Sequence, residues 1–247
     1  MIPGLLTDTV APDVRDAVDH ALLWGLETVA LRTLGRERVP NTNEARLLRV
    51  LAEAEMPVAW IDPGLLEGEF SNRASVLGDI EALRDLAPFC HRIGCSVVAV
   101  GALAATPRET GDVVRSLRGA GEVAASKGLS LAVRNGDAYP SALDLAALLR
   151  EVDHPAVGGL WSVAASRVAR ENLIASARAL AEAGLLAVEA DEELASADPE
   201  ASGLVALARA GFAGPVVLAF SGRPLEGLAV STGLVRSLRL SRRAARG

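Results

Sequence analysis

One pattern recurs about every 30 residues along this sequence of 247 residues. A short apolar run is followed by a polar loop, then by an amphipathic stretch, and then by a glycine or proline that precedes the next apolar run. Each run is too short for a helix and apolar enough for a strand that is covered on both faces. The eight runs are Ile2–Leu6, Thr28–Leu31, Val58–Ile61, Ser96–Val100, Leu129–Val133, Val157–Trp161, Leu185–Val188 and Pro215–Phe220.

The stretches between these runs have apolar residues at helical spacing and charges on the opposite face. Val14, Val18 and Leu22, for example, form one stripe. The predicted helices span Asp13–Trp24, Asn43–Glu55, Ala74–Ile93, Pro107–Lys127, Ser141–Glu151, Ala169–Ala183, Pro199–Ala210 and Leu225–Arg243. Glycines at the ends of several helices favour the left-handed conformation that stops a helix, and two prolines act as stops as well. These residues are Gly25, Gly94, Gly128, Gly184, Gly211, Pro57 and Pro155.

Eight strands that alternate with eight helices predict an α/β fold, a single (β/α)8 TIM barrel that spans residues 1–247 as one domain. Parallel strands need long crossover connections of this kind. The main alternative is an open doubly wound sheet. Such a sheet usually has fewer strands, and its Gly-x-Gly-x-x-Gly signature does not follow the first strand here.

Charge and composition narrow the range of partners. The net charge of −6 and the pI of about 5.2 argue against nucleic acid or an acidic membrane as a general partner. The basic run 236–243 is interpreted as the solvated face of the last helix. The N-terminus lacks the features of a signal peptide, and no apolar run has the length of a membrane span. We therefore expect a cytoplasmic protein with a small-molecule ligand, and a homo-oligomer stays open.

Chemistry in such a barrel occurs where strands end and the following loops begin. This rule excludes several mechanisms. Lys127, the only lysine, ends a helix at the opposite face, which argues against a Schiff base. The three histidines lie away from the strand ends, and Cys90 and Cys95 are expected to be small buried apolar residues. The candidates that remain at the mouth are Asp8, Arg32, Asp62, Arg134, Asn135, Tyr139, Trp161, Ser162, Glu189, Asp191, Ser221 and Arg223.

Three segments, taken in order and with their spacing, resemble the xylose isomerase-like TIM-barrel superfamily. They are Ala21–Arg32, Glu122–Asn135 and Ala210–Ala219. This superfamily includes sugar phosphate isomerases and epimerases, and the resemblance covers nearly the whole chain. It implies one divalent metal held at the strand ends by two glutamates, an aspartate and a histidine. The two glutamates would also serve as the acid and base around the substrate carbon.

The sequence departs from that pattern at the metal ligands. The corresponding positions read Ala30, Arg134, Ser162 and Ala219, and the region of the histidine reads Val-Glu-Ala-Asp at 188–191. We therefore expect a divergent member with a degenerate, metal-free site and no cofactor.

Arg134 is the most informative of these changes. A guanidinium cannot ligate a metal, but it can occupy the place of a cation and attract carboxylates. Arg134 is therefore predicted to pair with Glu189 or Asp191 across the mouth.

Two functions fit these residues. The first is a sugar phosphate isomerase or epimerase in which Glu189 and Asp191 transfer protons and Arg134 stabilises an enediolate oxygen. The second is a non-catalytic barrel that binds a small anionic or sugar ligand, or a protein partner. The remaining candidate residues at the mouth would bind the ligand. Its anionic group would lie near Ser221 and Arg223, and its sugar ring would stack on the aromatic side chains. An abasic-site endonuclease is set aside, because several metals and a basic face are missing.

Overall fold

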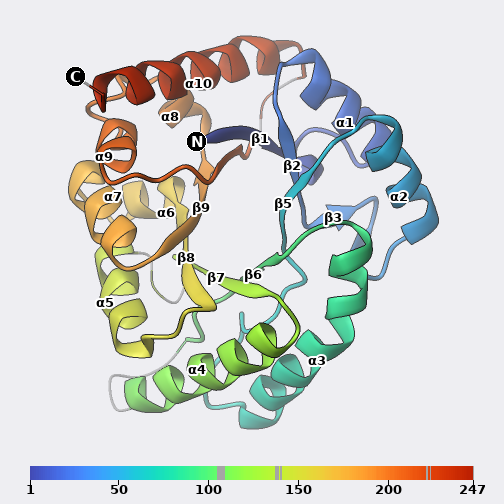
Figure 1. Ribbon diagram of the computed structural model, residues 1–247, viewed down its shortest axis with the longest axis vertical. Coiled ribbons are helices and arrows are strands. Elements are labelled where there is room, and N and C mark those ends of the chain that lie inside the picture. The colour runs from blue at the N-terminus through green and yellow to red at the C-terminus, as the bar shows by residue number, and fades with distance from the viewer. Residues whose placement is uncertain (105–108, 137–138, 140, 221, 223, 247) are drawn as a thin grey trace.

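Eight parallel strands close into a barrel in the computed structural model, which describes residues 1–104, 109–136, 139, 141–220, 222 and 224–246 (Figure 1). The order around the barrel is β1-β10-β9-β8-β7-β6-β5-β2. This closure confirms the predicted (β/α)8 fold. The strands are β1 (Ile2–Leu6), β2 (Thr28–Leu31), β5 (Val58–Ile61), β6 (Val97–Val100), β7 (Ser130–Arg134), β8 (Val157–Ser162), β9 (Leu185–Ala190) and β10 (Pro215–Leu218).

The helices form a ring outside the strands (Figure 1). They are α1 (Val14–Leu23), α2 (Glu44–Glu53), α3 (Arg73–Arg92), α4 (Thr110–Ser126), α5 (Ala142–Val152), α6 (Val163–Val168), α7 (Leu173–Glu182), α8 (Glu192–Ser196), α9 (Leu204–Arg209) and α10 (Pro224–Ala244). Eight of them correspond to the predicted helices, although α9 begins later than expected. The short helices α6 and α8 were not predicted. Nor was the antiparallel pair β3 (Thr33–Leu34) and β4 (Glu37–Arg38), which follows β2.

The predicted glycine stops have the backbone conformation expected of them. Gly25, Gly94 and Gly128 have φ of 69°, 68° and 69°, and Gly184 and Gly211 have φ of 94° and 82°. These values lie in the left-handed region, which glycine adopts without the penalty of a Cβ atom. The recurring glycines therefore set the length of the helices and return the chain to the barrel.

One side chain from each strand fills the interior of the barrel. These residues are Leu6, Ala30, Trp60, Ala99, Ala132, Leu160, Ala187 and Val217. Four of the eight are alanines, and the large indole of Trp60 occupies the space that they leave. Trp60 is therefore a core residue.

Successive side chains of a strand point to opposite faces, so the residue two positions after each interior residue also faces inward. Along each strand, the residue two positions after the interior layer lies at the mouth of the barrel. The residues at these positions are Asp8, Arg32, Asp62, Gly101, Arg134, Ser162, Glu189 and Ala219. The pleat of the strands thus brings together charged residues that are far apart in the sequence. Among the described helices, none is long and apolar enough to cross a membrane.

Candidate active site at the mouth of the barrel

Arg134 lies at the centre of the mouth, at the end of β7. Its Nη1 is 3.1 Å from Oδ2 of Asp62 and 3.6 Å from Oε2 of Glu189, and its Nη2 is 3.2 Å from Oε1 of Glu67. The predicted contact of Arg134 with Glu189 is therefore present, and two further carboxylates share the same guanidinium. Asp62 is 1% exposed and Arg134 is 20% exposed, so their ion pair is largely shielded from water, whereas Glu67 is 37% exposed.

A second guanidinium, that of Arg38, contacts two of the same carboxylates. Its Nη2 is 2.5 Å from Oδ1 of Asp62 and 2.8 Å from Oε1 of Glu67. Burial alone would lower the pKa of Arg38, but Glu67 and Asp62 raise it above its ordinary value. Arg38 and Glu67 were missed by the sequence reasoning because neither follows a barrel strand directly. Arg38 belongs to the unpredicted strand β4, and Glu67 lies in the loop after β5.

Two glycines allow this loop to lie over the mouth. A Cβ atom on Gly101 would overlap the carbonyl oxygen of Leu66, and Gly101 N donates to the carbonyl oxygen of Leu65 at 2.9 Å. Gly64 has φ of 80°, and a Cβ there would lie 2.6 Å from Cζ of Arg38. The loop after β5 is thus held against the segment after β6, and Glu67 is held above the barrel.

Arg32, at the end of β2, is paired with Asp8. Its Nε and Nη2 donate to the two carboxylate oxygens of Asp8 at 2.8 and 3.2 Å. Burial alone would lower the pKa of Arg32, but the hydrogen bond to Asp8 and the charge of Asp8 raise it above its ordinary value. This bidentate geometry fixes the plane of the guanidinium. Nη1 of Arg32 takes no part in the pair.

Glu189, on β9, is oriented by neighbours on β8. Ser162 Oγ donates to Oε1 of Glu189 at 3.3 Å. The backbone of Ser162 is fixed in turn by the side chain of Asn135, whose Oδ1 accepts from Ser162 N at 2.6 Å and whose Nδ2 donates to Ser162 O at 3.0 Å. Oε2 of Glu189 is buried and has no hydrogen-bond partner among the described residues. One oxygen of Glu189 is therefore positioned by hydrogen bonding, while the other lies 3.6 Å from Nη1 of Arg134.

Asp191 has a different environment from the one predicted. It caps α8, because its Oδ1 accepts from Leu194 N at 2.7 Å, and its Oδ2 is 3.1 Å from Nε of Arg167. The alternative pairing of Arg134 with Asp191 is therefore wrong, since Arg167 of the unpredicted helix α6 contacts Asp191 instead. The position of Asp191 directly after β9 is also that of a helix N-cap, which is the role that it has here.

The aromatic candidates lie in packed surroundings. Trp161 has no exposed surface, and its Nε1 donates to Ser166 Oγ at 3.0 Å. Its indole is therefore part of the core and presents no face to a ligand. Tyr139 is half-buried and packs against the core, and burial raises the pKa of its phenol. Asn135 is also fully buried and connects β7 to β8. Ser221 and Arg223 lie outside the described residues.

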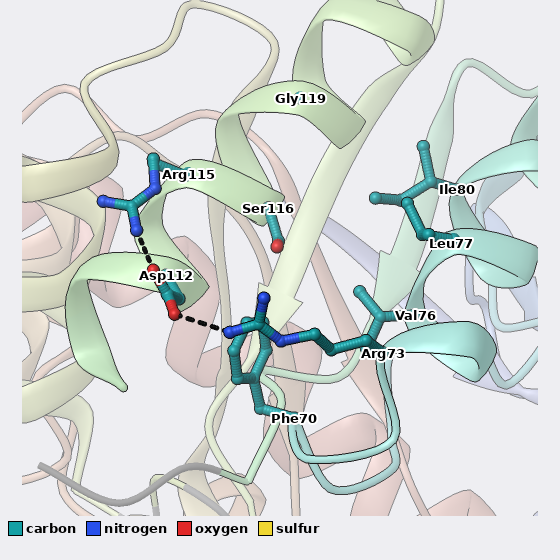
Figure 2. A pocket seen from close by; sticks show the side chains of 9 residues that line it. All are labelled: Phe70, Arg73, Val76, Leu77, Ile80, Asp112, Arg115, Ser116 and Gly119. Atoms are coloured by element: carbon teal, nitrogen blue, oxygen red, sulfur yellow. Dashed lines mark hydrogen bonds and ion pairs between the residues drawn. The ribbon is translucent and has the colours of Figure 1, made fainter. Parts of the chain in front are cut away.

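A hollow of about 440 Å³ lies at the mouth. Its lining consists of Arg32, Arg38, Glu67, Gly101, Ala102, Arg134 and Gly136. Three guanidinium groups and one carboxylate therefore line the hollow, and the buried Asp62 is paired with two of these guanidinium groups. A larger groove of about 500 Å³ lies between the first halves of α3 and α4 on the outer surface (Figure 2).

A divalent cation does not fit the residues of this mouth. The Arg134 guanidinium occupies the space between Asp62, Glu67 and Glu189, where a cation would repel it. The hydroxyl of Ser162 and the methyl group of Ala219 are poor replacements for carboxylate ligands. Among the residues that the structure describes, no group of three or more His, Cys, Asp or Glu side chains is arranged to hold a metal.

The fold and the strand-end residues together define a TIM barrel with an arginine-centred mouth. Its fold is that of xylose isomerase-like sugar epimerases and isomerases. A D-tagatose 3-epimerase-like protein matches with a TM-score of 0.80 at 13% identity, over 98% of this chain and 99% of that one. The apo form of the 3-keto-D-glucoside 4-epimerase YcjR from E. coli matches with a TM-score of 0.75 at 16% identity, over 97% and 99% of the two chains. IOLI protein with a bound zinc atom matches with a TM-score of 0.73 at 13% identity, over 98% of each chain.

These identities are low, and the likeness concerns the fold. No protein-family model matches the sequence, and no curated protein matches it either.

Proposed function

We propose that this protein is a sugar isomerase- or epimerase-type barrel whose site works without a divalent metal. The observation that carries the proposal is the position of Arg134, whose guanidinium lies between the carboxylates of Asp62, Glu67 and Glu189. A fixed positive charge at the strand ends supplies what a metal would otherwise supply, namely electrostatic stabilisation of an oxyanion. The fold shared with sugar epimerases supports a hydroxy-carbonyl substrate such as a small sugar or sugar phosphate.

Glu189 is the proton-transferring residue in this proposal. Moving a proton next to a carbonyl needs a base beside the substrate carbon and a donor beside the developing oxyanion. Oε2 of Glu189 has no hydrogen-bond partner among the described residues and lies 3.6 Å from Nη1 of Arg134. Base and oxyanion donor are thus adjacent. Glu189 is not among the residues that line the hollow, so the proposal requires the substrate carbon to reach past Arg134 to this oxygen. Asp191 is assigned no proton transfer, because its two oxygens contact Leu194 N and Arg167.

The hollow at the mouth suits a ligand with hydroxyl and anionic groups. A guanidinium offers five N–H donors, and the pairs described above leave part of these free at Arg32 and Arg134. Glu67 is the carboxylate in the lining and can accept hydrogen bonds from hydroxyls. The volume of about 440 Å³ is within the range of small-molecule sites.

A second candidate, binding without turnover, is favoured by one specific observation. Both oxygens of Asp62 contact guanidinium groups, and both oxygens of Asp8 are held by Arg32. Glu189 is therefore the mouth carboxylate best placed to take a proton, whereas epimerisation through two bases needs a pair of such groups. The lack of a second free carboxylate therefore favours binding over epimerisation. It does not argue against an aldose–ketose type of isomerisation, in which one base removes and returns the proton.

The two candidates are separated by one series of measurements on the purified protein. Metal content is measured first, and thermal unfolding is then recorded with sugars, sugar phosphates and hydroxy acids, with and without EDTA. A ligand that stabilises the protein is incubated with it in D2O, and deuterium next to the carbonyl is followed by NMR. We expect stabilisation that EDTA does not change, and exchange that Glu189→Gln abolishes.

The possible outcomes bear on different parts of the proposal. Stabilisation without deuterium exchange in the wild-type protein supports the binding candidate. Loss of exchange on treatment with EDTA, or stoichiometric metal that is needed for ligand binding, rejects the metal-free site.

A further inference from the structure

Glu67 is the one carboxylate in the lining of the hollow at the mouth, among the residues that the structure describes. Its Oε2 accepts from Nη1 of Arg38 at 3.1 Å, and its Oε1 accepts from Nη2 of Arg38 at 2.8 Å. Nη2 of Arg134 donates to the same Oε1 at 3.2 Å. Guanidinium groups bind the carboxylate or phosphate of a ligand in this way. Glu67 therefore occupies the position in which an anionic ligand group would contact both arginines.

The backbone on both sides of Glu67 is tied to its surroundings. Leu66 N donates to Oδ2 of Asp79 on α3 at 2.8 Å, and the carbonyl oxygen of Gly68 accepts from Ala104 N at 3.1 Å. These hydrogen bonds hold the chain before and after Glu67 in place. A ligand anion that takes the position of its carboxylate must therefore break the hydrogen bonds that this side chain makes with the two guanidinium groups.

Each nitrogen of the Arg38 guanidinium already donates to a group of the protein. Besides its two bonds to Glu67, Arg38 donates from Nε to the carbonyl oxygen of Asp62 at 3.2 Å and from Nη2 to Oδ1 of Asp62 at 2.5 Å. Arg32 differs, since its Nη1 takes no part in the pair with Asp8. The hollow thus offers a donor at Arg32 and an acceptor at Glu67, which is the combination that a hydroxyl group can satisfy.

The charges at the mouth are unfavourable for a further anion. Among the described residues, the ion pairs around the hollow join three guanidinium groups to four carboxylates, so one negative charge is in excess. These groups belong to Arg32, Arg38, Arg134, Asp8, Asp62, Glu67 and Glu189. A phosphate ester would add about two further negative charges at neutral pH. Because like charges repel strongly where water is partly excluded, an uncharged ligand is favoured.

We propose that Glu67 determines the substrate class of the mouth. It admits an uncharged hydroxy-carbonyl compound, such as a free sugar, and it excludes phosphorylated sugars and sugar acids by holding the position of their anionic group. This inference rests on the function proposed above and narrows it, since that function includes both sugars and sugar phosphates. The anionic group that Arg134 stabilises is then the oxyanion that develops during proton transfer, while Glu67 accepts from a substrate hydroxyl.

Inorganic phosphate is the first probe, because its binding does not depend on turnover. Thermal unfolding at constant ionic strength gives its dissociation constant from the rise in melting temperature. Glu67→Ala removes the carboxylate and frees donors of Arg38 and Arg134, so we expect phosphate to bind at least about tenfold more tightly than to the wild-type protein. Glu67→Gln removes the charge but keeps the size, and it should show a smaller gain in the same direction. The matched control is Glu69→Ala, an exposed glutamate of the same loop that accepts from Ser71 Oγ, and it should behave like the wild-type protein.

D-Fructose and D-fructose 6-phosphate are a matched pair of probes for the preference between uncharged and phosphorylated ligands. For Glu67→Ala we expect the phosphate ester to gain affinity and the free sugar to lose it, because an acceptor for its hydroxyls is removed. The ratio of the two affinities should change at least about tenfold in favour of the ester. A residue that merely holds the loop in place would weaken both ligands, so the opposite signs identify selection by charge.

Circular dichroism confirms that each variant is folded before its affinities are compared, and phosphate bound elsewhere on the surface contributes equally to all variants. A wild-type protein that binds phosphate as tightly as Glu67→Ala overturns the proposal, and so does a Glu67→Ala protein whose affinity for phosphate is unchanged or lower. A failure of the proposed function is seen separately, as the absence of deuterium exchange with every sugar. That result would leave the phosphate measurements, and with them the role of Glu67, in place.

Discussion

Nη1 of Arg134 lies 3.1 Å from Oδ2 of Asp62, a carboxylate that is only 1% exposed. The other oxygen of Asp62 is 2.5 Å from Nη2 of Arg38. One buried negative charge is therefore neutralised from two sides, by a residue of β7 and by a residue of β4. Because an unpaired buried charge costs several kcal/mol, this arrangement ties the strand ends and the β3–β4 pair to one another.

Removal of the central guanidinium should destabilise the protein. Arg134→Ala leaves Asp62 with Arg38 as its remaining charge partner, and we expect the free energy of unfolding to fall by about 2 kcal/mol. Urea unfolding at neutral pH measures the change. Arg32→Ala is the control, because its pair with Asp8 is more exposed to water and should contribute less than about 1 kcal/mol. Equal losses for the two variants would contradict the central role of Arg134.

The same variant should acquire affinity for a divalent cation. Arg134→Ala removes the positive charge between Oδ2 of Asp62 and Oε2 of Glu189, two buried oxygens with no hydrogen-bond partner among the described residues, while Arg38 keeps its contacts with Glu67 and with the other oxygen of Asp62. We expect Mn²⁺ to raise the melting temperature of Arg134→Ala by several degrees, but not that of Arg32→Ala. If Mn²⁺ stabilises the wild-type protein to the same extent, Arg134 does not take the place of a cation.

The loop over the mouth depends on Gly64. Gly64→Ala would introduce a Cβ atom 2.6 Å from Cζ of Arg38, at a residue with φ of 80°. The substitution should cost about 1–3 kcal/mol and displace Arg38, which should also weaken any ligand of the mouth. Thermal unfolding and ligand titration measure the two effects. Gly68→Ala in the same loop is the control, because nothing lies within 4 Å of its added Cβ and it should be nearly neutral.

The barrel could be predicted from the sequence because its signals are local. The apolar runs, the helical spacing and stops such as Gly25 and Gly94 act within a few residues, and φ at these glycines agrees with the prediction. The mouth residues followed from the rule that chemistry lies where the strands end, and the alternation seen in the structure places Arg32, Asp62 and Arg134 in one layer. Neither inference required long-range contacts.

The partners of these residues could not be predicted in the same way. Arg38 and Glu67 lie in connections whose course depends on packing, such as the approach of Leu66 to Gly101. Arg167 lies on a short helix with no clear periodicity, and it pairs with Asp191, one of the two carboxylates predicted as alternative partners of Arg134. Strand ends therefore identify the candidates, but the loops decide which of them pair.

Helix α4 allows a prediction from two glycines that are close in sequence. Gly119 lines the groove between α3 and α4, and no atom lies within 4 Å of a Cβ added there (Figure 2). Gly119→Ala should raise the free energy of unfolding by about 0.5–1 kcal/mol, because glycine is unfavourable inside a helix. Gly121→Ala should lower it, since its Cβ would lie 2.6 Å from Val157 and 2.7 Å from Nδ1 of His154. Urea unfolding compares the two, and the same sign for both would contradict the packing of α4.

The two buried cysteines should make the free energy of unfolding fall at alkaline pH. Burial raises the pKa of Cys90 to about 12 and that of Cys95 to about 11, from an ordinary value of 9.0. The folded protein therefore keeps both thiols protonated above pH 9, while the unfolded chain loses these protons. The contribution to stability is fully present below about pH 9 and is lost as the pH rises towards 11 and 12. Urea unfolding at about pH 8 and about pH 10 should show a larger loss for the wild-type protein than for Cys90→Ala/Cys95→Ala. Identical losses in the two proteins would show that other groups cause the alkaline transition.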